Sequence, residues 1–296
     1  MPARSGAQQL AACYSGPAGL HFHFGAAGLP HHVTHGRSPA LPKTVAFDLP
    51  LQSLMREAEI EFMRRVIPPW QSAIGLRTVL DLGCGVGYFS AMLRDLGFEV
   101  TATDSRAGNI AEARNRYPGV DFRVADAEDP SLSSLGKFDL VFCFGLLYHL
   151  ENPFRVIRNL HALTGKLLLL ESMSVPNEQP FLLVLDEPAG VDQSMGAVSF
   201  YPSDGAIIKM AFRAGFPHVY QFRELPNHEN YRASVGRECT RTMFAVATQP
   251  LDSPLLRATA EPMPSGDLWT TDPTGISRVL RRIRQKLKRS RMLKRS

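Results

Sequence analysis

The stretch VLDLGCGVGY at residues 79–88 decides the fold, because an apolar strand runs into a glycine-rich turn and then into a helix. Glycines let the main chain turn tightly and let a ligand come close to backbone N–H groups. The spacing here is G-x-G-x-G, whereas dinucleotide-binding loops use G-x-G-x-x-G. Asp81, just before the glycines, would crowd a pyrophosphate with negative charge and suits the ammonium or sulfonium end of a cationic ligand. The loop therefore argues against a nicotinamide dinucleotide.

Acidic residues also stand where the following strands are expected to end. Asp104 follows an expected strand, about 20 residues beyond the first glycine, where an acid accepts both ribose hydroxyls of a nucleoside. Asp126 follows the third expected strand and is placed near an adenine. The fourth expected strand leads into Gly145. Because parallel strands end at the same edge of a sheet, we expect one nucleoside site at this edge.

Strand-like and helix-like patterns alternate along most of the chain. Alternation of this kind predicts a mostly parallel, doubly wound sheet with helices on both faces. The last two expected strands follow each other without a full helix between them, so at least one should run antiparallel. The expected strands are residues 78–82, 99–103, 121–125, 140–144, 166–171, 218–222 and 242–247, and the expected helices are 51–66 (stopped by Pro68 and Pro69), 88–96, 109–116, 154–163 and 203–214.

These motifs resemble the class I S-adenosylmethionine-dependent methyltransferases, over roughly residues 50–248. The resemblance implies an α/β fold with a doubly wound, seven-stranded, mostly parallel sheet and an antiparallel last strand. It also implies S-adenosyl-L-methionine as the cofactor. In the implied site, Asp81, Gly83, Cys84 and Gly85 hold the methionine part, Asp104 binds the ribose, Asp126 and the Ala127 backbone contact the adenine, and Phe144 and Gly145 line the floor near the sulfonium.

The sequence GLLYHLENP at residues 145–153 narrows the resemblance. It is similar to a subgroup with a Leu-Tyr-His-Leu motif, which includes enzymes that modify the tRNA wobble uridine as well as small-molecule and sugar methyltransferases. His149 lies at the rim where an acceptor would approach and is predicted to be a general base. Tyr148 would shape the pocket or donate a hydrogen bond. The structural alternative is that His149 only hydrogen-bonds a neighbouring loop.

We therefore predict methyl transfer to a hydroxyl or similar nucleophile of a small molecule, such as a sugar or a secondary metabolite. One alternative is an RNA methyltransferase that modifies the tRNA wobble uridine. Wobble-uridine enzymes with a carboxylated cofactor need basic residues for the carboxylate, and the sequence assigns none here. The other alternative is a non-catalytic module that binds the cofactor.

The charge of the chain is unevenly distributed. Ten of its 33 Lys and Arg lie in residues 273–296 without an acid, so the remainder holds 23 basic and 28 acidic side chains, a net of −5. The basic stretch has an aliphatic stripe at helical spacing, which suits an anionic membrane surface, RNA phosphates or a solvated tail. The predicted layout is a disordered extension (1–44), a methyltransferase domain (45–249) with a substrate-covering insertion (174–202), a linker (250–275) and a basic amphipathic tail (276–296).

The cysteines and the hydropathy pattern indicate the cellular compartment in which the protein is expected. Cys13, Cys84, Cys143 and Cys239 lie far apart and form no C-x-x-C pair, so neither a metal site nor a disulfide framework is expected. There is no basic and apolar secretory leader at the N-terminus and no apolar run long enough to span a membrane. A cytoplasmic protein, peripheral at the membrane through its tail, is the expectation.

Overall fold

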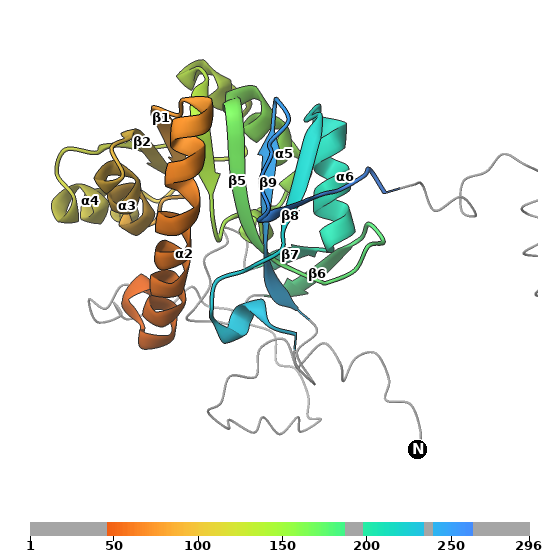
Figure 1. Ribbon diagram of the computed structural model, residues 1–296. Coiled ribbons are helices and arrows are strands. Elements are labelled where there is room, and N and C mark those ends of the chain that lie inside the picture. The colour runs from red at the N-terminus through yellow and green to blue at the C-terminus, as the bar shows by residue number, and fades with distance from the viewer. Residues whose placement is uncertain (1–45, 187–197, 234–238, 263–296) are drawn as a thin grey trace, which may run out of the picture. The chain divides into compact units, whose positions relative to one another are not determined.

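The protein is built around one eight-stranded sheet, seen edge-on in the computed structural model, which describes residues 46–186, 198–233 and 239–262 (Figure 1). The strand order is β10-β8-β9-β5-β4-β1-β2-β3. The strands are β1 (Thr78–Leu82), β2 (Glu99–Asp104), β3 (Asp121–Val124), β4 (Phe138–Cys143), β5 (Thr164–Ser174), β8 (His218–Phe222), β9 (Thr240–Ala247) and β10 (Leu256–Ala258).

Five neighbouring strands of this sheet are parallel, and the other junctions are antiparallel. From β3 through β2, β1 and β4 to β5, each pair runs parallel. Strand β9 runs antiparallel between β5 and β8, and β10 runs antiparallel to β8. The chain therefore reverses its direction of travel across the sheet between β1 and β4, which is the point where ligands bind in such folds.

The predicted α/β class, parallel sheet and antiparallel closing strand are confirmed, but the predicted number of seven strands is wrong. The additional strand is β10, which lies in the stretch predicted to be a linker. It has only three residues, too few for a recognisable alternation of apolar and polar side chains. Leu256 is buried, and its backbone pairs with Phe222 on β8, which gives this short segment its place at the sheet edge.

Helices cover both faces of the sheet. On one face, α2 (Pro50–Ile74), α3 (Tyr88–Asp95) and α4 (Ala107–Arg116) pack on a core that includes Val79 of β1. On the other face, α5 (Pro153–Leu163) and α6 (Asp204–Ala214) pack on a core that includes Leu80. Consecutive side chains of a strand point to opposite faces, so both faces of β1 are buried. This explains why the strand reads as a continuous apolar run.

Helix α2 is longer than the sequence predicts. The expected stop at Pro68 and Pro69 is wrong: the helix continues to Ile74 and ends at Gly75, which adopts a left-handed conformation with φ 65°. Each proline removes one backbone hydrogen bond. Trp70, in the turn beyond the prolines, is buried in the core on this face, and that burial offsets the loss.

A separate hairpin of β6 (Leu182–Asp186) and β7 (Val198–Pro202) occupies the insertion expected at 174–202. Its inward side chains, Leu183, Leu185 and Tyr201, pack together with Tyr148 and Cys239. The hairpin is thereby anchored beside the Leu-Tyr-His-Leu segment.

The predictions for residues 1–44 and 276–296 lie outside the described residues and stay predictions, as does the proposed membrane contact of the tail. No helix in the described ranges is long and apolar enough to cross a membrane.

Candidate functional site

A cavity of about 360 Å³ opens at the carboxyl ends of the central strands. It joins the glycine loop after β1 to residues after β2 and β4, and to α2. Asp81, Gly85 and Ala127, which were also predicted to belong to the site, are not among the lining residues. The predicted residues that do line the cavity are Gly83, Cys84, Asp104, Asp126, Phe144, Gly145, Tyr148 and His149.

The glycine loop is held by hydrogen bonds to the end of β2. The backbone N–H groups of Gly83 and Cys84 donate to the Thr103 carbonyl at 2.8 and 2.9 Å. Gly83 has a φ of 81°, and a Cβ there would lie 2.8 Å from the Leu146 side chain. Both the left-handed backbone and the close approach require glycine. The loop therefore carries no side chain at Gly83, where a ligand would contact its backbone.

Asp104 is fixed in orientation at the end of β2. Its Oδ2 accepts the Gly85 N–H at 3.0 Å, and its Oδ1 accepts the Arg106 N–H at 2.9 Å and the Asn109 side-chain amide at 3.1 Å. A carboxylate has about four acceptor positions, so capacity remains for a further donor. Asp104 is therefore oriented to accept a hydrogen bond from a ribose hydroxyl.

Asp81 lies beneath the loop rather than on the cavity wall. It is 2% exposed, and its Oδ2 accepts a hydrogen bond from the Ser90 hydroxyl at 2.6 Å. Burial raises the pKa of its carboxyl to about 7, and the nearby charge of Asp104 adds to the rise. A cation bound above the loop would favour the ionised carboxylate and lower this pKa.

At the other end of the cavity lies a group that we call the buried polar cluster: Glu59, Tyr148, Glu171, Tyr231 and Arg241. Glu171 ends the apolar run of β5, and Arg241 reaches it from β9. The Nη1 of Arg241 lies 2.8 Å from both carboxylate oxygens of Glu171, and its Nη2 donates to the Tyr148 hydroxyl at 3.0 Å. Glu171 is 0% and Arg241 is 8% exposed, so this ion pair is removed from water.

The ion pair is also tied to the cavity floor. The Gly145 N–H donates to Glu171 at 2.8 Å, so the carboxylate carries hydrogen bonds from both a guanidinium and the backbone. Gly145 has a φ of 68°, which directs its N–H away from the regular strand path. Glu171 and Arg241 thereby set the position of the segment that enters the Leu-Tyr-His-Leu motif.

Glu59 belongs to the same cluster, from the side of α2. Its Oε1 accepts a hydrogen bond from the Tyr231 hydroxyl at 2.6 Å. Burial raises the pKa of Glu59 to about 7, and the negative charge of Glu171 acts in the same direction. Arg241 and the hydrogen bond from Tyr231 oppose the rise.

His149 and Tyr148 lie together on the short helix η4 (Leu147–His149). Their ring centroids are 4.0 Å apart. The backbone N–H of His149 donates to the Leu146 carbonyl at 2.9 Å. Tyr148 also contacts Tyr201 of the hairpin, with ring centroids 5.4 Å apart. Helix η4 is thus held between the Glu171–Arg241 pair and the hairpin.

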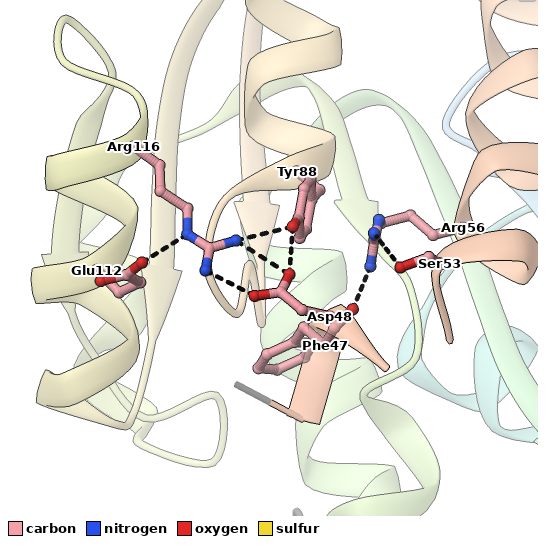
Figure 2. Close-up of polar contacts among 7 residues, drawn as sticks. All are labelled: Phe47, Asp48, Ser53, Arg56, Tyr88, Glu112 and Arg116. Carbon is pink, nitrogen blue, oxygen red and sulfur yellow. Dashed lines mark hydrogen bonds and ion pairs between the residues drawn. The ribbon is translucent and has the colours of Figure 1, made fainter. Parts of the chain in front are cut away.

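The short helix η2 (Ala46–Asp48), just before α2, is held over the glycine loop by a group of contacts that Figure 2 shows. Asp48 accepts hydrogen bonds from Arg116 at 2.8 and 3.1 Å and from the Tyr88 hydroxyl. The hydrogen bond with Arg116 holds the pKa of Asp48 at about 2, so this contact stays charged at ordinary pH. The Phe47 ring lies where a Cβ on Gly85 would come within 2.9 Å of it, which covers that glycine.

Sequence reasoning missed Glu59, Glu171, Tyr231 and Arg241. Glu171 carries a signal similar to that of Asp104, an acid at the end of the apolar run of a strand. Arg241 is a cation inside a strand that is buried along its whole length. Glu59 is one of three acids in α2 at alternate positions, and only burial separates it from the exposed Glu57 and Glu61.

Comparison with known proteins agrees with this geometry. Residues 80–166 match the model of the methyltransferase domain family. A tRNA U34 carboxymethyltransferase of Campylobacter jejuni is 26% identical over 159 residues, which are 51% of this chain and 53% of that one. A ubiquinone biosynthesis O-methyltransferase of Pseudomonas paraeruginosa is 33% identical over 118 residues, 36% of this chain and 51% of that one. The chain thus spans about half the length of the curated relatives it matches.

Among solved structures, the N-terminal domain of EvdMO1 with SAH bound has the same fold. Its TM-score is 0.56 at 18% identity, covering 68% of this chain and 85% of that one. Residues 80–166, which include the glycine loop, thus match a methyltransferase domain, and the sheet around them has the fold of that SAH-bound domain. The class and cofactor type predicted from the sequence are confirmed at the level of this domain.

Proposed function

We propose that the protein transfers a methyl group from S-adenosyl-L-methionine to a hydroxyl group of a small molecule. The observation that carries the proposal is the cavity itself. One part of it is lined by Gly83 and Cys84 of the glycine loop beside the fixed carboxylate of Asp104, and another part is lined by acids, a histidine and a tyrosine. A nucleoside fits the first part, and a polar acceptor fits the second.

In this reaction the cofactor supplies a methyl group already activated on a sulfonium. The chain has mainly to hold the two reactants in line and to keep water away. Asp104 and Asp126 orient the nucleoside, and Gly145 sets the floor where the two reactants meet. A hydroxyl acceptor also needs a group that removes its proton.

Replacing Asp104 with alanine is expected to weaken binding of S-adenosylhomocysteine tenfold or more. One hydrogen bond from a ribose hydroxyl to a charged acceptor is lost, at about 1.5–3 kcal/mol, which is tenfold or more in affinity. Calorimetric titration of the folded variant measures the change. Asp121→Ala is the control. Asp121 is the first residue of β3, at the end of that strand away from the cavity, and it pairs with the exposed Arg123. Equal affinity of the Asp104 variant and wild type would remove Asp104 from the site.

If His149 is the general base predicted from the sequence, replacing it with alanine lowers kcat and leaves the affinity for S-adenosylhomocysteine unchanged. His149 lines the cavity on η4, beside Tyr148 and away from Asp104. Turnover at the wild-type rate across the pH range would mean that His149 only holds the rim of the cavity.

The second candidate is modification of the tRNA wobble uridine, with a carboxylated cofactor. It is favoured by the presence of Arg241 in the cavity wall and by the relative from Campylobacter jejuni. Against it, Glu171 already neutralises that guanidinium through both of its oxygens. We therefore expect no transfer of label to RNA.

Incubation of cell-extract fractions with methyl-labelled cofactor separates these possibilities. Small metabolites, lipids and RNA are counted separately. Label in the small-metabolite fraction supports the proposal, and label in RNA supports the second candidate. Transfer to any fraction excludes the remaining alternative, a non-catalytic binding module.

A further inference from the structure

Glu59 has the properties of a group that exchanges protons with a ligand in the cavity. It is 3% exposed, yet its side chain lines the cavity wall. Within the described part of the chain, the hydrogen bond from Tyr231 reaches Oε1, and no hydrogen bond reaches Oε2. A buried carboxyl with one oxygen left open is costly unless something fills that position.

The other carboxyl of the buried polar cluster, that of Glu171, already accepts hydrogen bonds on both oxygens. Glu171 accepts hydrogen bonds from Arg241 on both oxygens and from Gly145 on one. Its charge is balanced by the guanidinium, and both of its oxygens already accept hydrogen bonds. Tyr148 accepts a hydrogen bond from the same guanidinium, which leaves Glu59 as the open acid of this cluster.

We propose that Glu59 is the catalytic base of the methyl transfer, taking the proton of the acceptor hydroxyl on Oε2. As the methyl carbon leaves, the C–S electron pair goes to sulfur, and the acceptor oxygen forms the new C–O bond. The hydroxyl proton moves to the Glu59 carboxylate and passes later to water. This assignment rests on the proposed function and makes the acceptor a hydroxyl compound small enough to reach α2.

The groups around Glu59 set its proton affinity near neutrality. Burial and the charge of Glu171 on β5 raise its pKa, to about 7. Arg241 on β9, Tyr231 on η5 (Glu229–Tyr231) and Arg56 on α2 each lower it. A base whose pKa lies near the working pH combines a large ionised fraction with a strong pull on the proton. Activity should therefore rise with pH through about 7.

The first test compares Glu59→Gln with wild type on the labelled acceptor fraction. The variant should lose about 100-fold or more in kcat, and its rate should no longer rise through neutral pH. Glu57→Gln is the matched control, an exposed acid on the same helix, and should behave like wild type. A Glu59→Gln variant that retains at least a third of the wild-type rate overturns the proposal. So does loss of the pH dependence in His149→Ala but not in Glu59→Gln.

A second test needs no acceptor. Infrared titration of the carboxyl groups, as the difference between wild type and Glu59→Gln, should show one group with a pKa near 7. Tyr231→Phe removes the hydrogen bond that favours the carboxylate, so the same group should titrate at higher pH. If no carboxyl is missing from the Glu59→Gln titration near neutrality, the assignment is wrong.

Titration with S-adenosylhomocysteine distinguishes a failure of the proposed function from a failure of the role of Glu59. If wild type fails to bind it, the proposed function fails. If wild type and Glu59→Gln bind it equally and the infrared and rate tests are negative, only the role of Glu59 fails.

Discussion

Replacing Glu171 with glutamine is expected to lower the free energy of unfolding by about 3–5 kcal/mol. The substitution keeps the shape of the side chain but leaves the Arg241 guanidinium, only 8% exposed, without its counter-charge. Urea denaturation monitored by circular dichroism measures the loss. Glu59 is a further acid whose charge acts on Arg241, and without the Glu171 charge its pKa falls below 7, so the loss should shrink as the pH rises toward 7.

Two control variants show whether charge is the cause. Removing both partners in Glu171→Gln/Arg241→Met should recover most of the stability, because no buried charge is left unpaired. Asp121→Asn breaks an ion pair whose side chains are 51% and 48% exposed, and should cost below about 1 kcal/mol. A double variant as unstable as Glu171→Gln alone would mean that packing or the Gly145 hydrogen bond, rather than charge, accounts for the effect.

Replacing Asp81 with asparagine is expected to stabilise the ligand-free protein above neutral pH. Folding raises the pKa of this carboxyl from 3.8 to about 7. The unfolded chain therefore releases the proton first, so the stability that Asp81 contributes below about pH 4 is lost as the pH rises to about 7. A pKa rise of this size corresponds to a loss of about 4 kcal/mol in the free energy of unfolding, and the asparagine variant does not undergo this loss.

The measurement is the midpoint of urea unfolding from pH 5 to 8 for both proteins. Wild type should weaken across this range relative to Asp81→Asn, whose profile is flatter. Asparagine can still accept the Ser90 hydrogen bond, so the local packing is kept. Parallel profiles would show that Asp81 stays ionised in the folded protein.

The same variant should bind S-adenosyl-L-methionine tenfold or more weakly, because the charge beneath the glycine loop is gone. S-adenosylhomocysteine has the ammonium but lacks the sulfonium charge. An equal loss for both ligands assigns Asp81 to the ammonium, and a larger loss for the methylated one assigns it to the sulfonium. Unchanged affinity for both would leave Asp81 a purely structural acid.

The cofactor end of the site could be predicted from sequence because its signals are local. The glycine loop, Asp104 and Asp126 each lie at the end of a strand or within two residues of it, and the topology brings these strand ends together. All three fall inside the segment, 80–166, that matches the methyltransferase domain family. The assigned roles of the individual residues stay predictions.

The buried polar cluster could not be predicted in the same way, because its members come from distant parts of the chain. Glu59, Glu171, Tyr231 and Arg241 lie on α2, β5, η5 and β9, and all fall outside residues 80–166. Their contacts depend on β9 entering between β5 and β8, which no local pattern encodes. The length of α2 and the pairing of β10 depend on tertiary burial for the same reason.

The position of β9 has a consequence for the order in which the two ends of the cavity form during synthesis on the ribosome. The strands β1 to β5 are made in sequence and pair as neighbours, so the part of the cavity formed by the glycine loop and Asp104 can assemble early. Arg241 and Tyr231 are made at least 60 residues after Glu171, and β8 has no sheet neighbour until β9 arrives. If the proposed function holds, a nascent chain can bind the cofactor before it has a place for the acceptor.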